Sequence, residues 1–110
     1  QGVAERVIES AKDLPAPDVD WGAFPESVAR GESDMHDIRV RNDGGGGSVG
    51  IRVTVNDVEM SAKTCYLSDD VTVPVGVFGA TDDELEFTVE VTFPDLPLLP
   101  IRESRTVRVD

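Results

Sequence analysis

The sequence predicts an all-β protein: an immunoglobulin-like antiparallel β-sandwich of about seven strands, preceded by a short N-terminal α-helix. Three observations favour this fold. Hydrophobic and polar residues alternate along several segments, turn-forming residues separate these segments, and the apolar positions hold mainly valine. Alternation indicates antiparallel strands with one face in the core, because parallel strands are usually apolar on both faces. The length of 110 residues is the common size of one domain.

An amphipathic helix is expected at the N-terminal end, over residues 2–14. Its apolar positions recur three or four residues apart, as they do on one face of a helix. They are Val3, Val7, Ile8, Ala11 and Leu14. Pro15 ends the pattern, because proline cannot donate to the helical hydrogen-bond ladder. Residues 15–20 then look like a short, stiff linker. We therefore expect two parts: 1–17, a helix with a proline-rich linker, and 18–110, the β-sandwich.

Period-two alternation defines the strands of the expected sandwich. The clearest strands are predicted at Met35–Asn42, Val49–Val55, Val71–Val77, Leu85–Phe93 and Thr106–Val109. Val58–Leu67 has a weaker pattern, which indicates two short strands or one bent strand. Asn56 and Asp57 form a turn signal, and Gly44–Gly47 is predicted to be a flexible hairpin tip. Pro74 removes a ladder donor, which points to an edge strand or a bulge.

The charge of the chain is strongly acidic. It has 22 Asp and Glu residues against 10 Lys and Arg residues, and its formal net charge is −12. Only Lys12 and Lys63 are lysines. An acid excess combined with few lysines resembles the proteins of extreme halophiles, especially haloarchaea. At about 1 M salt the Debye length is only ~3 Å, so self-repulsion is screened, whereas at low salt it opposes the compact state.

The same charge argues against two classes of partner. The sequence has no basic stripe for a nucleic-acid backbone, and an anionic membrane surface would repel it. No apolar run approaches the ~20 residues of a transmembrane helix, so we expect no direct membrane insertion by this segment. The chain begins at Gln1 rather than methionine, which is typical of a mature or truncated product.

No catalytic constellation is expected. His36 is the only histidine, and a general base needs a nucleophile and an orienting partner within reach. Ser33 and Asp37 are near it in sequence, but Asp37 should point to the opposite face of the strand. We therefore interpret His36 as a strand residue. Cys65 is the only cysteine, which excludes an internal disulfide, and its alternating surroundings predict a buried structural thiol.

Metal and cofactor sites are likewise not expected. The acidic loop segments Asp69–Asp70, Asp82–Glu84 and Asp18–Asp20 lack the Asp-x-Asp-x-Asp-Gly spacing of a calcium loop. In a chain this acidic, paired carboxylates occur by chance. Gly44–Gly47 could cradle an anion through backbone donors, but the Lys and Ser or Thr of a phosphate loop do not follow it.

Two groups of apolar residues are candidates for a protein interface. Trp21 and Phe24 precede the first clear strand, while Leu96, Leu98 and Leu99 lie between prolines in a late loop. Leucines are costly to leave in water, so either the ends of the sandwich or a partner should cover them. Together with the apolar face of the helix, the candidate interface residues are Val3, Val7, Ile8, Leu14, Trp21, Leu96, Leu98 and Leu99.

Residues 25–43 resemble the opening of a known family. They contain Pro25, Val28 and Gly31 at spacings of three, then a strand that ends in Asn42 and is followed by Gly44. This pattern is similar to that of CARDB-type immunoglobulin-like domains in archaeal and bacterial surface proteins. The resemblance covers about residues 21–110, with the glycine loop and the Leu-Pro insertion as departures. It implies a non-catalytic spacer or adhesive module.

Taken together, these features predict a non-catalytic structural or interaction module of an extracellular haloarchaeal assembly. The assembly could be a virus particle, a surface layer or an appendage, with protein partners or other copies of the chain held through protein–protein contacts. Two alternatives remain open. One is an accessory binding domain of a larger secreted enzyme. The other is the soluble domain of a membrane-anchored, archaellum-type stator protein.

Overall fold

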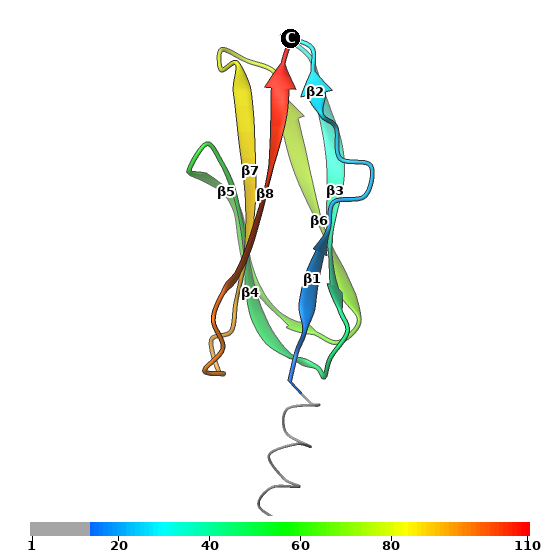
Figure 1. Cartoon of the computed structure of the whole chain (residues 1–110), viewed down its shortest axis with the longest axis vertical. Helices are drawn as coiled ribbons and strands as arrows, with labels where there is room; N and C mark the ends of the chain where they lie inside the picture. Colours follow the sequence, from blue (N-terminus) through cyan, green and yellow to red (C-terminus); the bar gives the residue numbers. More distant parts are fainter. Residues whose placement is uncertain (1–13) are drawn as a thin grey trace, which may run out of the picture.

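The computed structural model describes residues 14–110 as two β-sheets packed face to face (Figure 1). Its strands are β1 (Pro17–Asp20), β2 (Ser27–Val28), β3 (Ser33–Asn42), β4 (Gly47–Val55), β5 (Val58–Leu67), β6 (Asp70–Phe78), β7 (Glu84–Thr92) and β8 (Ile101–Val109). The predicted all-β sandwich is confirmed. The predicted helix at 2–14 lies outside the described residues except for Leu14, which is in a bend. In residues 14–110 no helix could cross a membrane.

The N-terminal part of the described chain contributes to both sheets. The three-stranded sheet has the order β1-β3-β6, and the five-stranded sheet has the order β2-β8-β7-β4-β5. β1 pairs antiparallel with β3, whereas β2 crosses to the other sheet and pairs parallel with β8. All other ladders are antiparallel. The segment from β1 to β2 therefore passes from one sheet to the other and connects them along one side of the sandwich.

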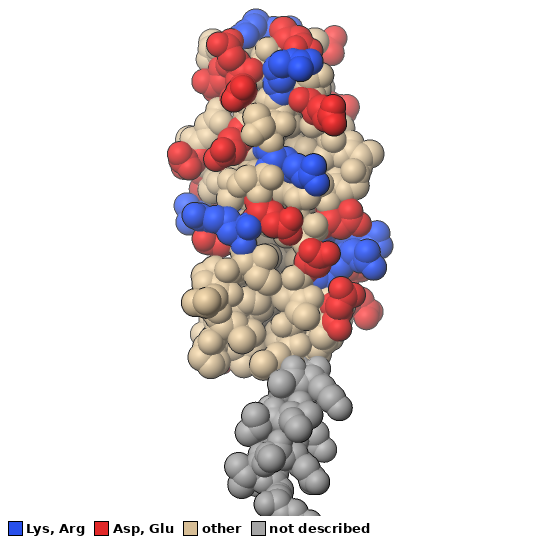
Figure 2. Space-filling view, viewed as in Figure 1, with Lys and Arg blue, Asp and Glu red and all other residues tan. Residues whose placement is uncertain are grey.

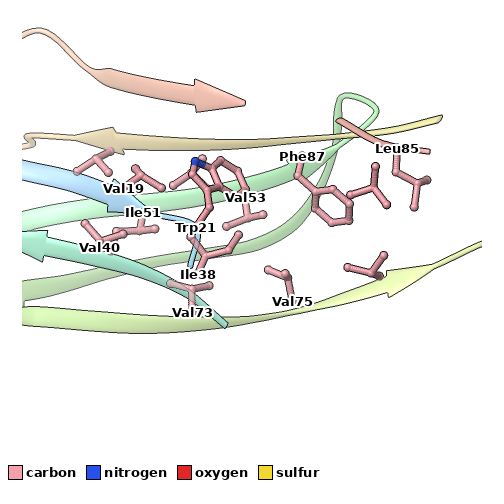
Figure 3. Packing of buried hydrophobic residues seen from close by; sticks show 14 of the residues in the cluster. Val19, Trp21, Ile38, Val40, Ile51, Val53, Val73, Val75, Leu85 and Phe87 are labelled. Carbon is pink, nitrogen blue, oxygen red and sulfur yellow. The ribbon is translucent and has the colours of Figure 1, made fainter. Parts of the chain in front are cut away.

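Alternating apolar side chains from both sheets form one core. Figure 3 shows Val40 and Val73 of the three-stranded sheet and Ile51 and Phe87 of the five-stranded sheet on opposite sides of it. Eleven of the 18 buried hydrophobic residues are valines, and no polar or charged residue of the described chain is buried. Fully burying a Val, Leu, Ile or Phe side chain contributes about 1.5–3 kcal/mol, so these alternating positions account for much of the stability.

The linker prediction for residues 15–20 is wrong over 17–20. These residues form β1, in which Val19 pairs with Val40 and is only 7% exposed, while Asp18 and Asp20 alternate with it. Pro15 and Pro17 are buried as well. Proline is tolerated at the first residue of an edge strand, because a donor facing away from the ladder is not missed. The proline-rich composition therefore led to a linker prediction for a segment that is a short strand of the sandwich.

The remaining strands lie close to their predicted positions. Val58–Leu67 is one strand rather than two, with a register shift against β4 between Val53 and Thr54. β6, which contains Pro74, is an edge strand, as its proline predicted. β8 begins at Ile101, earlier than the predicted Thr106. Its first half carries no apolar alternation, because the charged residues there line the side of the sandwich rather than the core.

The turn between β4 and β5 has the geometry that its sequence predicted. Asn56 and Asp57 both have positive φ angles, of 49° and 66°, which is the type I′ pattern of two-residue hairpins. Asn56 also binds the neighbouring strand β7: its N–H donates to the Glu86 carbonyl at 3.0 Å, and its Oδ1 accepts from the Glu86 N–H at 2.8 Å. The hairpin tip is thereby fixed to the sheet.

Candidate functional site

His36 is held in a structural environment. Its side chain packs beside the Phe24 ring, with centroids 5.7 Å apart, and its Nε2 lies 3.5 Å from Asp34 Oδ2. Asp37 is on the exposed face of β3, as predicted. Within residues 14–110, no hydrogen bond joins His36 to a serine, threonine or cysteine that could act as a nucleophile. The arrangement is that of a half-buried strand residue beside an aromatic cluster.

Three carboxylates of the acidic loop segments are engaged in local pairing. Asp83 accepts from Arg30 at 3.0 Å, Asp70 accepts from Arg39 at 2.7 Å, and Asp82 accepts from Asn56 at 3.4 Å. At the C-terminal end, a hydrogen bond from Arg108 lowers the pKa of the Asp110 carboxyl. Across the part of the chain that the structure describes, no three His, Cys, Asp or Glu side chains are grouped closely enough to hold a metal ion.

Cys65 is half-buried rather than fully buried, because it lies on β5 at the edge of the five-stranded sheet. It pairs with Val49 and packs against the core from the side. The predicted structural role agrees with these contacts, but the predicted degree of burial was too high.

The glycine loop is a packed corner, and its interpretation as a flexible hairpin tip is wrong. It connects β3 in one sheet to β4 in the other, so it is not a hairpin. A side chain at Gly44 would collide with the backbone of Leu14 and Ala16, and one at Gly47 would meet Pro15 at 2.9 Å. Glycine is required here because the N-terminal segment passes directly over the loop.

Asn42 organises this corner. Its Oδ1 accepts hydrogen bonds from the Ala16 N–H at 2.9 Å and the Gly44 N–H at 3.1 Å. Its Nδ2 group lies within bonding distance of three carbonyl oxygens, those of Gly45, Leu67 and Ser68, at 3.0–3.3 Å. One amide side chain therefore joins the entry of the chain, the glycine loop and the β5–β6 connection.

The late proline-leucine loop covers the same end of the sandwich. Leu96 and Leu98 are half-buried and pack against the core, whereas Leu99 is 87% exposed. Tyr66, 69% exposed, lies over Gly46. On the face seen in Figure 2, most of this lower end is free of charged side chains, apart from acidic side chains toward its right side, although charges are spread over the rest of the sandwich. We call this end, formed by 44–47, Tyr66 and 94–100, the loop end; Asp95 is the only charged residue among these.

Trp21 is a core residue, and its place among the candidate interface residues is corrected. It is 4% exposed and packs edge-on against Phe24, with centroids 5.2 Å apart; Phe24 in turn packs against Phe87. The crossing from β1 to β2 carries this aromatic pair into the space between the sheets. Of the other candidates, Val3, Val7 and Ile8 lie outside the described residues, and Leu14 is half-buried with its carbonyl accepting from Gly45.

A groove runs along the side of the sandwich between β1 and β8. It is lined by Asp18, Val19, Asp20, Trp21, Gly22, Arg41, Glu103 and Arg105. The Arg105 guanidinium lies over the Trp21 ring, 5.8 Å from its centroid, and Glu103 Oε2 accepts from the Val19 N–H at 3.3 Å. No sequence pattern indicated this groove, because it joins residues more than 80 positions apart. We call it the side groove.

Comparison with known proteins identifies the fold. No family model and no curated protein match the sequence. The crystal structure of the CARDB domain of the PF1109 protein from Pyrococcus furiosus, in complex with di-metal ions, matches with a TM-score of 0.73 and 17% identity, covering 89% of this chain and 90% of that one. The solution NMR structure of that domain matches with a TM-score of 0.61 and 14% identity, covering 87% and 95%.

A β-glucosidase from Listeria innocua, solved in complex with glucose, also matches. Its TM-score is 0.51 at 10% identity, and the match covers 86% of this chain but 16% of the enzyme. At these identities the similarities establish the fold alone. They agree with the resemblance carried by Pro25, Val28, Gly31 and Asn42 in the sequence. The described chain therefore has an immunoglobulin-like β-sandwich fold similar to that of the CARDB domain of the PF1109 protein.

Proposed function

We propose that this chain is a non-catalytic structural or interaction module of an extracellular haloarchaeal assembly, such as a virus particle, a surface layer or an appendage. It acts through protein–protein contacts and has no chemistry of its own. The fold of a CARDB domain supports the modular role, and the acid excess with few lysines supports a protein adapted to molar salt. The carboxylates of Asp83 and Asp70 are bonded to arginines of the same chain, which supports the interpretation of the acidic surface as an adaptation to salt rather than as a ligand site.

The loop end is the observation that carries the proposal. In a chain of net charge −12, Asp95 is the only charged residue among 44–47, Tyr66 and 94–100, and this end includes the exposed Leu99 and Tyr66. Exposed apolar side chains gathered at one place mark a surface that a partner could cover. The chain also enters the sandwich at this end, where Pro15 and Ala16 cross the glycine loop. An upstream segment and a partner would therefore meet at one place.

Analytical sedimentation of the full chain in molar salt tests the proposal. We expect concentration-dependent association, weakened by Leu99→Ser and by removal of residues 1–13. The cut stops at 13 because Pro15 and Pro17 belong to the sandwich. The matched control is Val58→Ser, which changes another apolar residue, 66% exposed, away from the loop end. A full chain that stays monomeric at all concentrations would contradict the self-assembly version.

A second candidate function, an accessory domain of a larger secreted enzyme, is supported by one finding. A domain of similar fold forms part of the Listeria β-glucosidase chain. The sequence of the complete reading frame distinguishes the two. A catalytic domain next to residues 1–110 favours the accessory role, and its absence favours the assembly module.

A further inference from the structure

One side of β8 has no strand beside it for most of its length. β2 pairs only with Arg108 and Val109, so the residues from Ile101 to Val107 have no strand partner on that side within the described chain. The Arg108 N–H donates to Glu26 and the Asp110 N–H to Val28, which shows that the N–H groups of even-numbered residues point to this side. Strand alternation then directs the N–H groups of Arg102, Ser104 and Thr106 the same way.

The other long edges of the two sheets are protected against strand addition. β6 contains Pro74, which cannot donate to a neighbour. β5 has a register shift against β4 and carries Lys63 directly across from the buried Ile51, so a charge lies on its core-facing side. Bulges, prolines and inward-facing charges all discourage edge pairing. The unpaired part of β8 contains no proline and no register shift against β7.

Two arginines with no carboxylate partner among residues 14–110 line the side groove next to this edge. The described chain has seven arginines, and Arg30, Arg39, Arg52, Arg102 and Arg108 each lie within 4.0 Å of an acidic side chain. The remaining two are Arg41 and Arg105, and both line the side groove. With more than twice as many acidic as basic residues in the chain, two arginines in one groove that pair with no described carboxylate indicate a place for an external anion.

The carboxylates of the groove are mostly occupied by backbone donors. Glu103 accepts from Val19, and Asp20 Oδ1 accepts from the Gly22 N–H at 3.0 Å, which leaves Asp18 without such a bond. The Trp21 Nε1 is buried and has no acceptor among the described residues. β8 itself carries three arginines and one glutamate. The groove thus offers donors and positive charge beside an open strand edge.

We propose that the side groove binds an extended acidic peptide segment, which adds to β8 as a new strand beside Arg102, Ser104 and Thr106. The backbone of the peptide would pair with the open edge, and its acidic side chains would meet Arg105 and Arg41. Strand addition uses main-chain hydrogen bonds for affinity and alternate side chains for specificity. The inference deepens the proposed function by naming the chemistry of one partner, and it rests on that function only in treating the chain as a binding module.

The test is an NMR titration of the full chain in molar salt with a capped synthetic heptapeptide in which aspartate alternates with valine. We expect the amide signals of Arg102, Ser104 and Thr106 to shift together, while those of β5 do not. A matched peptide with lysine in place of aspartate should bind at least about tenfold more weakly, because it reverses the charge that meets the arginines.

Variants of two arginines distinguish binding in the side groove from a general effect of losing one positive charge. Arg105→Gln should weaken binding of the aspartate peptide by about tenfold, the scale of one charge-assisted hydrogen bond. Arg52→Gln is the matched control, because Arg52 pairs with Glu59 on the outer face of the sheet and should leave binding unchanged. Both positions are half-exposed or more, so either variant should fold.

Three results would overturn the inference: no shift of the β8 amides at millimolar peptide, equal binding of the lysine peptide, or unchanged affinity in Arg105→Gln. None of them bears on the loop end, whose test is the sedimentation of Leu99→Ser. Failure of the peptide titration is therefore distinguishable from failure of the proposed function.

Discussion

Lys63 lies directly opposite Ile51 in the ladder of β4 and β5, so one of the two lysines of the chain occupies the core-facing side of an edge strand. A second copy that paired with β5 would have to enclose this ammonium group. We expect Lys63→Val to increase self-association in molar salt, because it removes the charge and extends the apolar strip. Sedimentation compares the variant with Lys63→Arg, which keeps the charge. Equal association of both variants would show that Lys63 does not protect the edge.

Asn42 should be among the most sensitive polar residues of the domain. Its side chain bonds the Ala16 N–H, the Gly44 N–H and three carbonyl oxygens. Asn42→Ala leaves these groups without partners, and we expect it to lower the free energy of unfolding by about 2–3 kcal/mol. Chemical denaturation in molar salt measures the change. The neighbouring exposed residue provides the control, since Asp43→Ala should stay within about 0.5 kcal/mol of the parent.

The glycine loop allows a comparison between two neighbouring positions. At Gly44 a methyl group meets the backbone of Leu14 and Ala16, which cannot easily move, whereas at Gly46 it meets the end of the Tyr66 side chain. We expect Gly44→Ala to destabilise the fold by about 1–3 kcal/mol and Gly46→Ala by clearly less. Thermal unfolding of the two variants checks this order. If the order is reversed, the N-terminal segment does not pack on the loop as described.

Salt should stabilise the fold. With a net charge of −12 and no buried polar residue in the described chain, repulsion among surface carboxylates is the main electrostatic term. Raising salt from about 0.1 M to about 1 M shortens the Debye length from about 10 Å to about 3 Å. We expect the melting temperature to rise over this range in KCl and to change less in sucrose. A melting temperature that is independent of KCl would count against adaptation to molar salt.

The strands of the sandwich were predictable because their signal is local. Apolar and polar residues alternate within a few positions along β4, as at Val49, Ile51 and Val53. The Asn-Asp pair at 56–57 is typical of a two-residue turn with positive φ angles, which is the geometry observed. β1 was missed because a four-residue strand that begins with proline looks like a linker, and only the pairing of Val19 with Val40 reveals it. A short segment can be assigned only once its partner strand is known.

The candidate surfaces were predictable only in part, since contacts between distant residues decide them. The sequence showed that the leucines of the late loop are unusual for a loop. It did not show that Leu99 is the one that stays exposed. Trp21 was an equal candidate for a protein interface, yet the crossing between the sheets buries it. The side groove had no sequence signal at all, because an arginine such as Arg105 does not show in the sequence whether a carboxylate lies nearby.

The crossing from β1 to β2 also has a mechanical consequence. Leu14 and Asp110 lie at opposite ends of the sandwich, so tension along the chain would slide β2 against β8 lengthwise (Figure 1). Three backbone hydrogen bonds span this contact, from Arg108 to Glu26, from Asp110 to Val28 and from Arg30 to Asp110. Under shear they share the load and must rupture together rather than unzip one by one. We expect single-molecule pulling between the two ends to meet its main resistance here.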